Sequence, residues 1–262
     1  MPADSYSLED LQTKPSPILD ACITRQPCPQ CHKPVKYFCY RCYTVVNVEP
    51  SVIPEVTLPV SLTILKHPKE KDGKSTAVHA KIIAPRYTQI LDFPSKDSTL
   101  PDPGRSVLLF PGPDSCRLAN MDPTTFDTVV VIDGTWSQAR AMVKYSPVLN
   151  QMRKVTLLPR QTRFWRYQQC DESYMATIEA IYFFYREYYE AYAGSKRNDC
   201  SKCSMVSVYD GRYDDLLFYY KYFYDHIQKL YRTNPHLRFT PRQKEGYIDY
   251  KANPSAQTTK DI

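Results

Sequence analysis

The stretch "VVVIDGTWSQARAM", residues 129–142, reads as a strand, a turn and a helix in direct succession. Its first four residues are all β-branched, which is typical of a strand buried on both faces of a mostly parallel sheet. Asp133 and Gly134 end this pattern. The apolar residues that follow recur at helical spacing: Trp136, Ala139, Met142 and Val143. A carboxylate at the end of a buried strand lies where α/β proteins bind ligands.

The segments around this unit alternate between strand and helix patterns. We expect strands within 58–68, 75–85, 105–115, 126–136 and 153–160, and helices over 136–146, 173–193 and 214–231. Such alternation predicts an α/β fold with a mostly parallel sheet and flanking helices. Ligands of these sheets bind beyond the carboxyl ends of the strands, so "FPGPDS" (110–115) and "DGTW" (133–136) are expected to share one pocket.

The composition divides the chain into four parts. Residues 1–24 are a polar lead-in or tail, 25–48 a cysteine cluster, 49–231 the main domain, and 232–262 a polar tail expected to be mobile. No apolar run approaches ~18 residues, so no membrane-spanning segment is expected. The N-terminus lacks the basic and apolar regions of a signal peptide. The nine cysteines are therefore expected in a reducing, intracellular compartment.

Positive charge is concentrated between residues 134 and 170. The chain has a net charge of +6, whereas this segment contains no Asp or Glu. Its basic residues are Arg140, Lys144, Arg153, Lys154, Arg160, Arg163 and Arg166. A concentrated basic face favours a polyanionic partner. Charge alone fits a solvated surface without a partner equally well.

"CPQCHKPVKYFCYRC", residues 28–42, contains two CxxC pairs. Each pair can turn two thiolates toward one metal, and four soft ligands in tetrahedral reach suit Zn²⁺. The ligands would be Cys28, Cys31, Cys39 and Cys42. Because they fill all four positions, we predict a structural zinc ion that braces a small knuckle. The alternatives are an iron–sulfur cluster and four unrelated thiols.

Two further sequence patterns resemble binding motifs, but we predict no site at either of them. Cys200 and Cys203 in "DCSKC" form a third pair with no obvious mate, and we interpret them as free thiols in a surface loop. The alternative is a second metal site completed by Cys170, Cys116 or a second chain. "DGKST", residues 72–76, resembles the end of a phosphate-binding loop, but Pro68 stands where that motif needs a glycine. We therefore predict no nucleotide triphosphate site there.

Six landmarks follow one another over roughly residues 25–231. They are the cysteine cluster, "HPKE" (67–70) with Thr76 downstream, "LLFPGPDS" (108–115), "DGTW" (133–136), "TRFWR" (162–166) and "MATIEAIYFF" (175–184). In this order they resemble the DTW-domain family of tRNA-uridine aminocarboxypropyltransferases, named after an Asp-x-Thr-Trp signature. The eukaryotic type-one branch is the most similar. The family usually has Leu-Ser-Thr where this chain has Met-Ala-Thr at 175–177.

The resemblance implies a fold similar to the SPOUT class of S-adenosylmethionine enzymes, in which the chain is knotted at the cofactor pocket. It also implies the reaction. The 3-amino-3-carboxypropyl group of S-adenosyl-L-methionine moves to N3 of a uridine in the tRNA D-loop, and methylthioadenosine leaves. The expected partner is then tRNA. The type-one branch favours the nucleus as the compartment, with the cytoplasm as the alternative.

This chemistry suggests roles for individual residues. N3 of neutral uracil carries a proton, and we predict Asp133 as the general base that accepts it. The alternative is that Asp133 caps the next helix and Trp136 packs in the core. Predicted cofactor contacts are Phe110, Gly112, Asp114, Thr135, Trp136, Leu157, Leu158, Thr177 and Glu179. Predicted tRNA contacts are Arg160, Arg163, Trp165 and Arg166.

Two rival functions fit the same residues. The first is an RNA methyltransferase of similar fold, which uses the same cofactor and differs in its product. The second is a catalytically inert, zinc-bearing tRNA-binding adaptor. The adaptor would keep the basic face but would not need Asp133.

Overall fold

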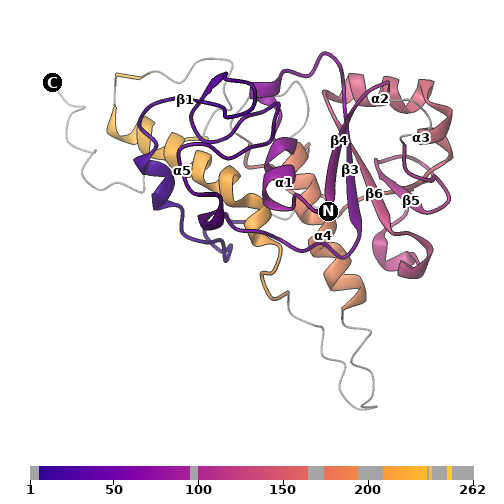
Figure 1. The fold of residues 1–262 in the computed structure, drawn as a ribbon. Coiled ribbons are helices and arrows are strands. Elements are labelled where there is room, and N and C mark those ends of the chain that lie inside the picture. The colour runs from indigo at the N-terminus through magenta and orange to yellow at the C-terminus, as the bar shows by residue number, and fades with distance from the viewer. Residues whose placement is uncertain are drawn as a thin grey trace, which may run out of the picture.

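The computed structural model describes residues 6–94, 100–164, 174–193, 209–234, 236–237 and 247–249. A five-stranded sheet of parallel strands lies at its centre, in the order β4-β3-β6-β5-β7. The strands are β3 Ser61–Lys66, β4 Thr88–Asp92, β5 Ser106–Leu109, β6 Thr128–Asp133 and β7 Arg153–Val155. The predicted α/β class with a mostly parallel sheet is therefore confirmed (Figure 1).

Helices cover both faces of this sheet. They are α1 Ala77–Ile83, α2 Trp136–Tyr145, α3 Pro147–Gln151, α4 Thr177–Tyr192 and α5 Phe218–Thr233. Short 3₁₀ turns connect the elements: η1 Pro17–Ala21, η2 Pro50–Val52, η3 Asp72–Lys74, η5 Leu118–Asn120, η6 Pro123–Thr125 and η8 Asp214–Leu217. In the part of the chain that the structure describes, no helix combines the length and the apolar character needed to cross a membrane.

The β-branched residues of β6 pack into two hydrophobic cores, one on each face of the sheet. Val129 and Val131 pack in the core that α1, α4 and α5 complete, whereas Val130 packs with α2 and α3. Consecutive strand residues point to opposite faces, so a strand covered on both sides is apolar at every position. β6 is also the middle strand, paired with β3 up to Lys66–Asp133 and with β5 on its other side. Asp133 therefore stands at the centre of the sheet's carboxyl edge.

Residues 75–85 were predicted as a strand, and this prediction is wrong because they contain α1. Six of the seven residues of α1 are buried. A short continuous apolar run fits a buried helix as well as a buried strand, and periodicity does not separate the two. The edge strand β4 follows α1 and was not predicted. The other predicted strands and helices are present with shifted ends.

Segments outside residues 49–231 also belong to the folded body. Leu8 and Leu19 are buried in the core with α4 and α5. Near the other end of the chain, Tyr247 is buried, and the Gln228 side chain on α5 donates a hydrogen bond to its carbonyl oxygen at 2.7 Å. The cysteine knuckle contains a two-stranded antiparallel ribbon, β1 Gln26–Pro27 and β2 Pro34–Val35.

Candidate active site and metal centre

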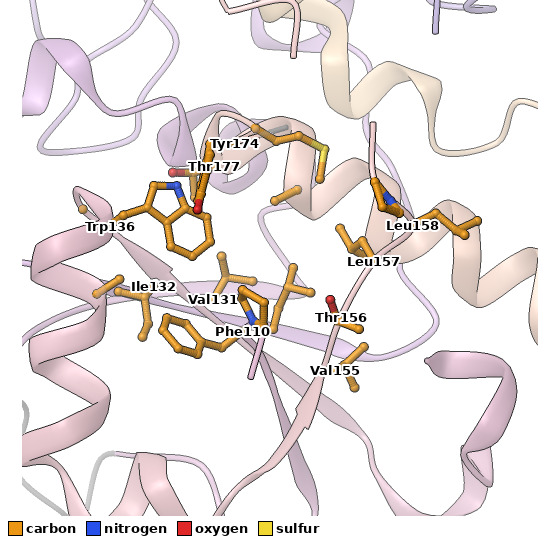
Figure 2. Close-up of a pocket in the computed structure, with 17 residues that line it drawn as sticks. Phe110, Val131, Ile132, Trp136, Val155, Thr156, Leu157, Leu158, Tyr174 and Thr177 are labelled. Carbon is orange, nitrogen blue, oxygen red and sulfur yellow. The ribbon is translucent and has the colours of Figure 1, made fainter. Parts of the chain in front are cut away.

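A cavity of about 340 Å³ opens at the carboxyl ends of β5, β6 and β7 (Figure 2). Small-molecule sites have volumes of about 300 to 1,000 Å³, so this cavity has the size of a ligand site. Its walls are mainly apolar. Phe110 and Pro111 line it from one predicted stretch, and Gly134 and Trp136 line it from the other. The strand order therefore brings "FPGPDS" and "DGTW" to the same cavity.

Aromatic rings flank this cavity. The Trp136 indole contacts Tyr174 edge-on, with ring centroids 4.7 Å apart, and its centroid lies 6.1 Å from that of Phe110. Trp136 is the first residue of α2, so its ring projects over the strand ends (Figure 2). Flat aromatic faces beside aliphatic side chains suit a planar heterocycle. The alternative that Trp136 packs in the core does not hold, because this half-buried ring lines the cavity.

Asp133 is 2% exposed, and both of its carboxylate oxygens accept hydrogen bonds from hydroxyl groups. Ser75 Oγ donates to Oδ2 at 2.7 Å, and Thr177 Oγ1 donates to Oδ1 at 2.9 Å. Burial raises the pKa of Asp133, while the two hydrogen bonds and the charge of Lys66 oppose the rise. Of these residues, Thr177 lines the cavity. Thr177 thus connects the buried carboxylate to the cavity.

Ser75 and Thr76 were not predicted as site residues. The Ser75 hydroxyl accepts a hydrogen bond from the Ala77 N–H at 3.2 Å, in addition to its donation to Asp133. Thr76 Oγ1 accepts from the Ile178 N–H at 3.2 Å. These hydroxyls join the starts of α1 and α4 to the end of β6. A Ser-Thr pair directly before an apolar run was the signal for this helix start.

The four cysteines belong to two turns of the same geometry. In the first turn, the N–H of Cys28 donates to the carbonyl of Lys33 and the N–H of His32 to the carbonyl of Cys28, both at 2.9 Å. In the second turn, Cys39 and Tyr43 make the corresponding bonds. The residue after each second cysteine has left-handed backbone, with φ of 57° at His32 and 55° at Tyr43. This repeat points the cysteines of both turns at one centre.

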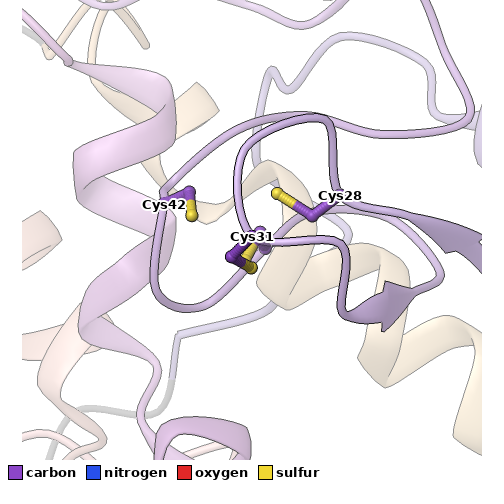
Figure 3. A group of neighbouring side chains, drawn as sticks. Cys28, Cys31 and Cys42 are labelled. Atoms are coloured by element: carbon purple, nitrogen blue, oxygen red, sulfur yellow. The ribbon is translucent and has the colours of Figure 1, made fainter.

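The donor set of this centre fits zinc. The ligand atoms of Cys28, Cys31, Cys39 and Cys42 all lie within 4.8 Å of one another (Figure 3). A tetrahedral Zn²⁺ with Zn–S bonds of about 2.3 Å places its sulfurs about 3.8 Å apart. Four thiolates around one point are therefore able to hold a single structural ion, and they leave no coordination position for a substrate.

The knuckle is fixed to the main domain at the edge that carries the cavity. Phe38 is 2% exposed, and its ring contacts His79 of α1 and Tyr219 of α5, with centroids 5.6 and 4.8 Å away. On another side, Arg41 Nε lies 3.6 Å from an oxygen of Asp72, which also pairs with Lys66. Lys66 ends β3 beside Asp133, so the knuckle contacts the carboxyl edge of the sheet.

Comparison with known sequences identifies the family. Residues 36–228 match the DTW domain, which is most of the chain. This chain belongs to the DTW-domain family. It is 31% identical over 243 residues to tRNA-uridine aminocarboxypropyltransferase 1 of Xenopus tropicalis, covering 76% of this chain and 78% of the relative. The Mus musculus protein of that name is 32% identical over 244 residues, 76% of each chain. No solved structure matches the chain.

The cavity of this DTW-domain protein includes five of the nine residues that we predicted as cofactor contacts. They are Phe110, Trp136, Leu157, Leu158 and Thr177. The other four are not among its described lining residues: Gly112, Asp114, Thr135 and Glu179. The hydrogen bonds of these four residues show what they do instead.

Thr135 is the N-cap of α2. Its Oγ1 accepts from the Gln138 N–H at 3.4 Å, and Gln138 Oε1 accepts from the Thr135 N–H at 2.7 Å, which completes a capping box. The alternative in which Asp133 caps α2 is therefore wrong. At Gly134, a Cβ atom would lie 3.1 Å from Cβ of His67, so glycine permits this close approach of two loops.

Gly112 and Asp114 brace the turn after β5. Ser115 Oγ donates to the carbonyl of Gly112 at 2.7 Å, and Lys154 of β7 forms an ion pair with Asp114. The Lys154 ammonium holds the pKa of Asp114 below its usual value. These bonds tie the turn to the next strand, beside the cavity.

Glu179 is completely buried and fully engaged by protein groups. Its carboxylate accepts from the Arg163 N–H at 2.8 Å and the Ala176 N–H at 2.7 Å, and also from the hydroxyls of Tyr6 and Thr162. It thereby joins the N-terminal segment, the chain after β7 and the start of α4. These contacts assign Glu179 to supporting the site.

Glu187, which the sequence reading missed, holds one wall of the cavity. Its Oε1 accepts from the Leu158 N–H at 3.0 Å and pairs with the buried Arg160 guanidinium. Arg160 also stacks over Phe183, 4.2 Å from the ring centroid. Glu187 lies eight residues after Glu179 on α4, just over two turns and on the same side of the helix. Glu179 and Glu187, two acids eight positions apart in a helix rich in aromatic residues, were the sequence signal that could have indicated this role.

The six basic residues of segment 134–170 that the structure describes do not form one exposed face. Arg160 is 6% and Lys154 8% exposed, and each pairs with an acid, so the predicted tRNA contact by Arg160 conflicts with its burial. Arg163 is half-buried, and its Nε donates to the Tyr6 carbonyl at 3.0 Å. Residues that lie outside the described part of the chain are Trp165, Arg166, Cys200 and Cys203.

Proposed function

We propose that this protein transfers the 3-amino-3-carboxypropyl group of S-adenosyl-L-methionine to N3 of a uridine in the D-loop of tRNA. Membership of the DTW-domain family supports this, because similar relatives are named tRNA-uridine aminocarboxypropyltransferases. One observation carries the proposal for this chain. Thr177 lines the cavity, and its hydroxyl donates to the buried carboxylate of Asp133.

The cavity suits S-adenosyl-L-methionine as co-substrate. Trp136 and Phe110 offer aromatic faces for adenine, while Leu157 and Leu158 provide aliphatic contact. When bound, S-adenosyl-L-methionine supplies a sulfonium with three carbons open to attack, so the choice among them is a matter of orientation. A parallel sheet with its cavity at the carboxyl edge also supports the SPOUT-like arrangement that we expect.

The protein's task in this reaction is to remove a proton. A bond forms between uracil N3 and Cγ of the methionine chain, the Cγ–sulfur bond breaks, and sulfur keeps the electron pair as the thioether of methylthioadenosine. Because the Thr177 hydroxyl donates to Asp133, it can accept the N3 proton on a lone pair while its own proton passes to the carboxylate. Burial raises the pKa of Asp133 and so makes its carboxylate a stronger base.

The four-cysteine centre has a structural role in this proposal. Cys28, Cys31, Cys39 and Cys42 would hold one Zn²⁺ and so keep the two turns of the knuckle together. Phe38, between these turns, packs on α1 and α5, so an ordered knuckle completes that side of the core. The ion takes no part in the transfer.

Labelled co-substrate tests the function directly. With label in the methionine chain of S-adenosyl-L-methionine, we expect the label in tRNA and in a modified uridine after nuclease digestion. With label in the methyl group, we expect it in methylthioadenosine. Methyl label in tRNA would identify a methyltransferase, and binding of tRNA without transfer of either label would identify an adaptor.

A further inference from the structure

The cysteine knuckle is a positively charged module. Residues 25–48 contain four basic residues and no Asp or Glu: Arg25, Lys33, Lys36 and Arg41. Lys36 is half-buried and the other three are exposed. Four thiolates and one Zn²⁺ would sum to two negative charges, which leaves the loaded knuckle positive.

The loop between β3 and α1 adds exposed lysines next to the knuckle. Lys69, Lys71 and Lys74 are exposed, and within the described ranges none of their side chains has an ion-pair partner. Asp72 of the same loop is neutralised, because Lys66 and Arg41 both pair with it. The loop contains one more acid, Glu70, so with Asp72 neutralised its three lysines leave a surplus of two positive charges.

Asp72 also fixes how the two segments are placed. It connects Arg41 of the knuckle to Lys66, which ends β3 in register with Asp133. In Figure 1, the knuckle around β1 and the helix α2 lie at the same, upper end of the molecule. The lysines of the loop thus lie at the edge of the sheet where the cavity opens, one strand away from Asp133.

We propose that the knuckle and the 67–74 loop together form the surface that binds the phosphate backbone of the RNA substrate and directs its target base to the cavity. This inference rests on the proposed function and deepens it by naming the surface that binds RNA. Lysines are mobile point charges, so they suit contacts to phosphates rather than to particular bases. The segment predicted for this role is less suitable, because Lys154 and Arg160 are buried in ion pairs.

A matched pair of triple variants tests the proposal. The test variant replaces Lys69, Lys71 and Lys74 with glutamine. The control variant, Arg86→Gln/Arg105→Gln/Arg153→Gln, removes the same charge from exposed residues that precede β4 and β5 or begin β7, at the opposite edge of the sheet. Binding of unmodified tRNA to the full zinc-loaded chain is measured as a function of salt, without S-adenosyl-L-methionine.

Losing three phosphate contacts should lower the slope of log K against log salt by about 2 and weaken binding at least about tenfold at 0.1 M salt. The control variant should keep the wild-type slope. Lys33→Gln/Lys36→Gln should lower the slope further when added to the test variant, and circular dichroism checks that the variants stay folded.

Several results would overturn the inference. They are an unchanged slope in the test variant, an equal loss in both triple variants, or no binding of tRNA by the wild-type chain. Label transfer separates the two proposals. A wild-type chain that transfers label while the test variant keeps its slope overturns only the RNA surface. A slope that depends on the three lysines, without transfer by the wild-type chain, supports the surface and refutes the proposed reaction.

Discussion

Replacing Asp133 with asparagine separates a catalytic role from a structural one. Asparagine has the size of aspartate and keeps one acceptor oxygen, but it does not take up a proton from a hydroxyl. In the structure, Ser75 and Thr177 both donate to Asp133, so the variant leaves one donor without its acceptor. A buried donor that is left without its acceptor costs about 1 to 3 kcal/mol. Removing a buried charge offsets part of that cost.

The pH dependence of stability shows whether removing the Asp133 charge stabilises or destabilises the folded chain. The pKa of Asp133 is raised in the folded state. Between the unfolded value near ~4 and the raised folded value, the folded chain binds more protons than the unfolded chain, so stability falls as pH rises through this window. Asparagine does not titrate. The free energy of unfolding of Asp133→Asn, relative to wild type, should therefore increase as pH rises through the window.

Activity and stability are thus expected to respond differently. Loss of a general base lowers transfer about a hundredfold or more, which corresponds to about 2.7 kcal/mol in activation free energy. Stability at pH 7 should fall by less than about 3 kcal/mol. Transfer of chain-labelled S-adenosyl-L-methionine to tRNA measures the first quantity, and urea unfolding measures the second.

Asp127→Asn is the matched control, because Asp127 is exposed and directly precedes β6, at the opposite end of that strand. It should retain wild-type transfer. The catalytic role is refuted if Asp133→Asn keeps more than about a tenth of the activity. A loss of more than about 3 kcal/mol in stability would instead show that the carboxylate holds the fold together.

Three further predictions follow from the contacts around the cavity and the knuckle. Thr177→Val should lower transfer as much as Asp133→Asn, whereas Thr177→Ser should keep transfer within about threefold of wild type. Equal activity of the two Thr177 variants would contradict proton transfer through the Thr177 hydroxyl. Changing Cys28 and Cys39 to serine should remove about one zinc per chain, measured by native mass spectrometry, and lower the unfolding midpoint. A folded wild-type chain without metal would refute the zinc assignment. Glu187→Gln should destabilise the protein by about 3 to 5 kcal/mol in urea unfolding, because it leaves the buried Arg160 charge without its partner, and a loss below about 1 kcal/mol would refute this.

Much of the architecture could be read from local patterns. The β-branched run before Asp133 indicated a strand buried on both faces, and β6 is the central strand of a parallel sheet. The two CxxC pairs predicted one centre, and their ligand atoms converge. These features depend on residues a few positions apart, so their spacing carries the information. Six ordered landmarks likewise identified the family that the comparison with known sequences established.

The site itself depends on contacts between distant residues. Ser75 and Thr177 reach Asp133 across 58 and 44 positions of sequence, because the chain before α1 and the start of α4 both meet the end of β6. From the charge pattern, Arg160 was predicted to belong to a basic face, but in the fold it is buried against Glu187. A charged residue looks the same in a sequence whether it faces water or a buried partner. Local spacing thus determined most elements and the ligand set of the knuckle, while the position of the first turn of α4 beside Asp133 determined which side chain reaches the cavity.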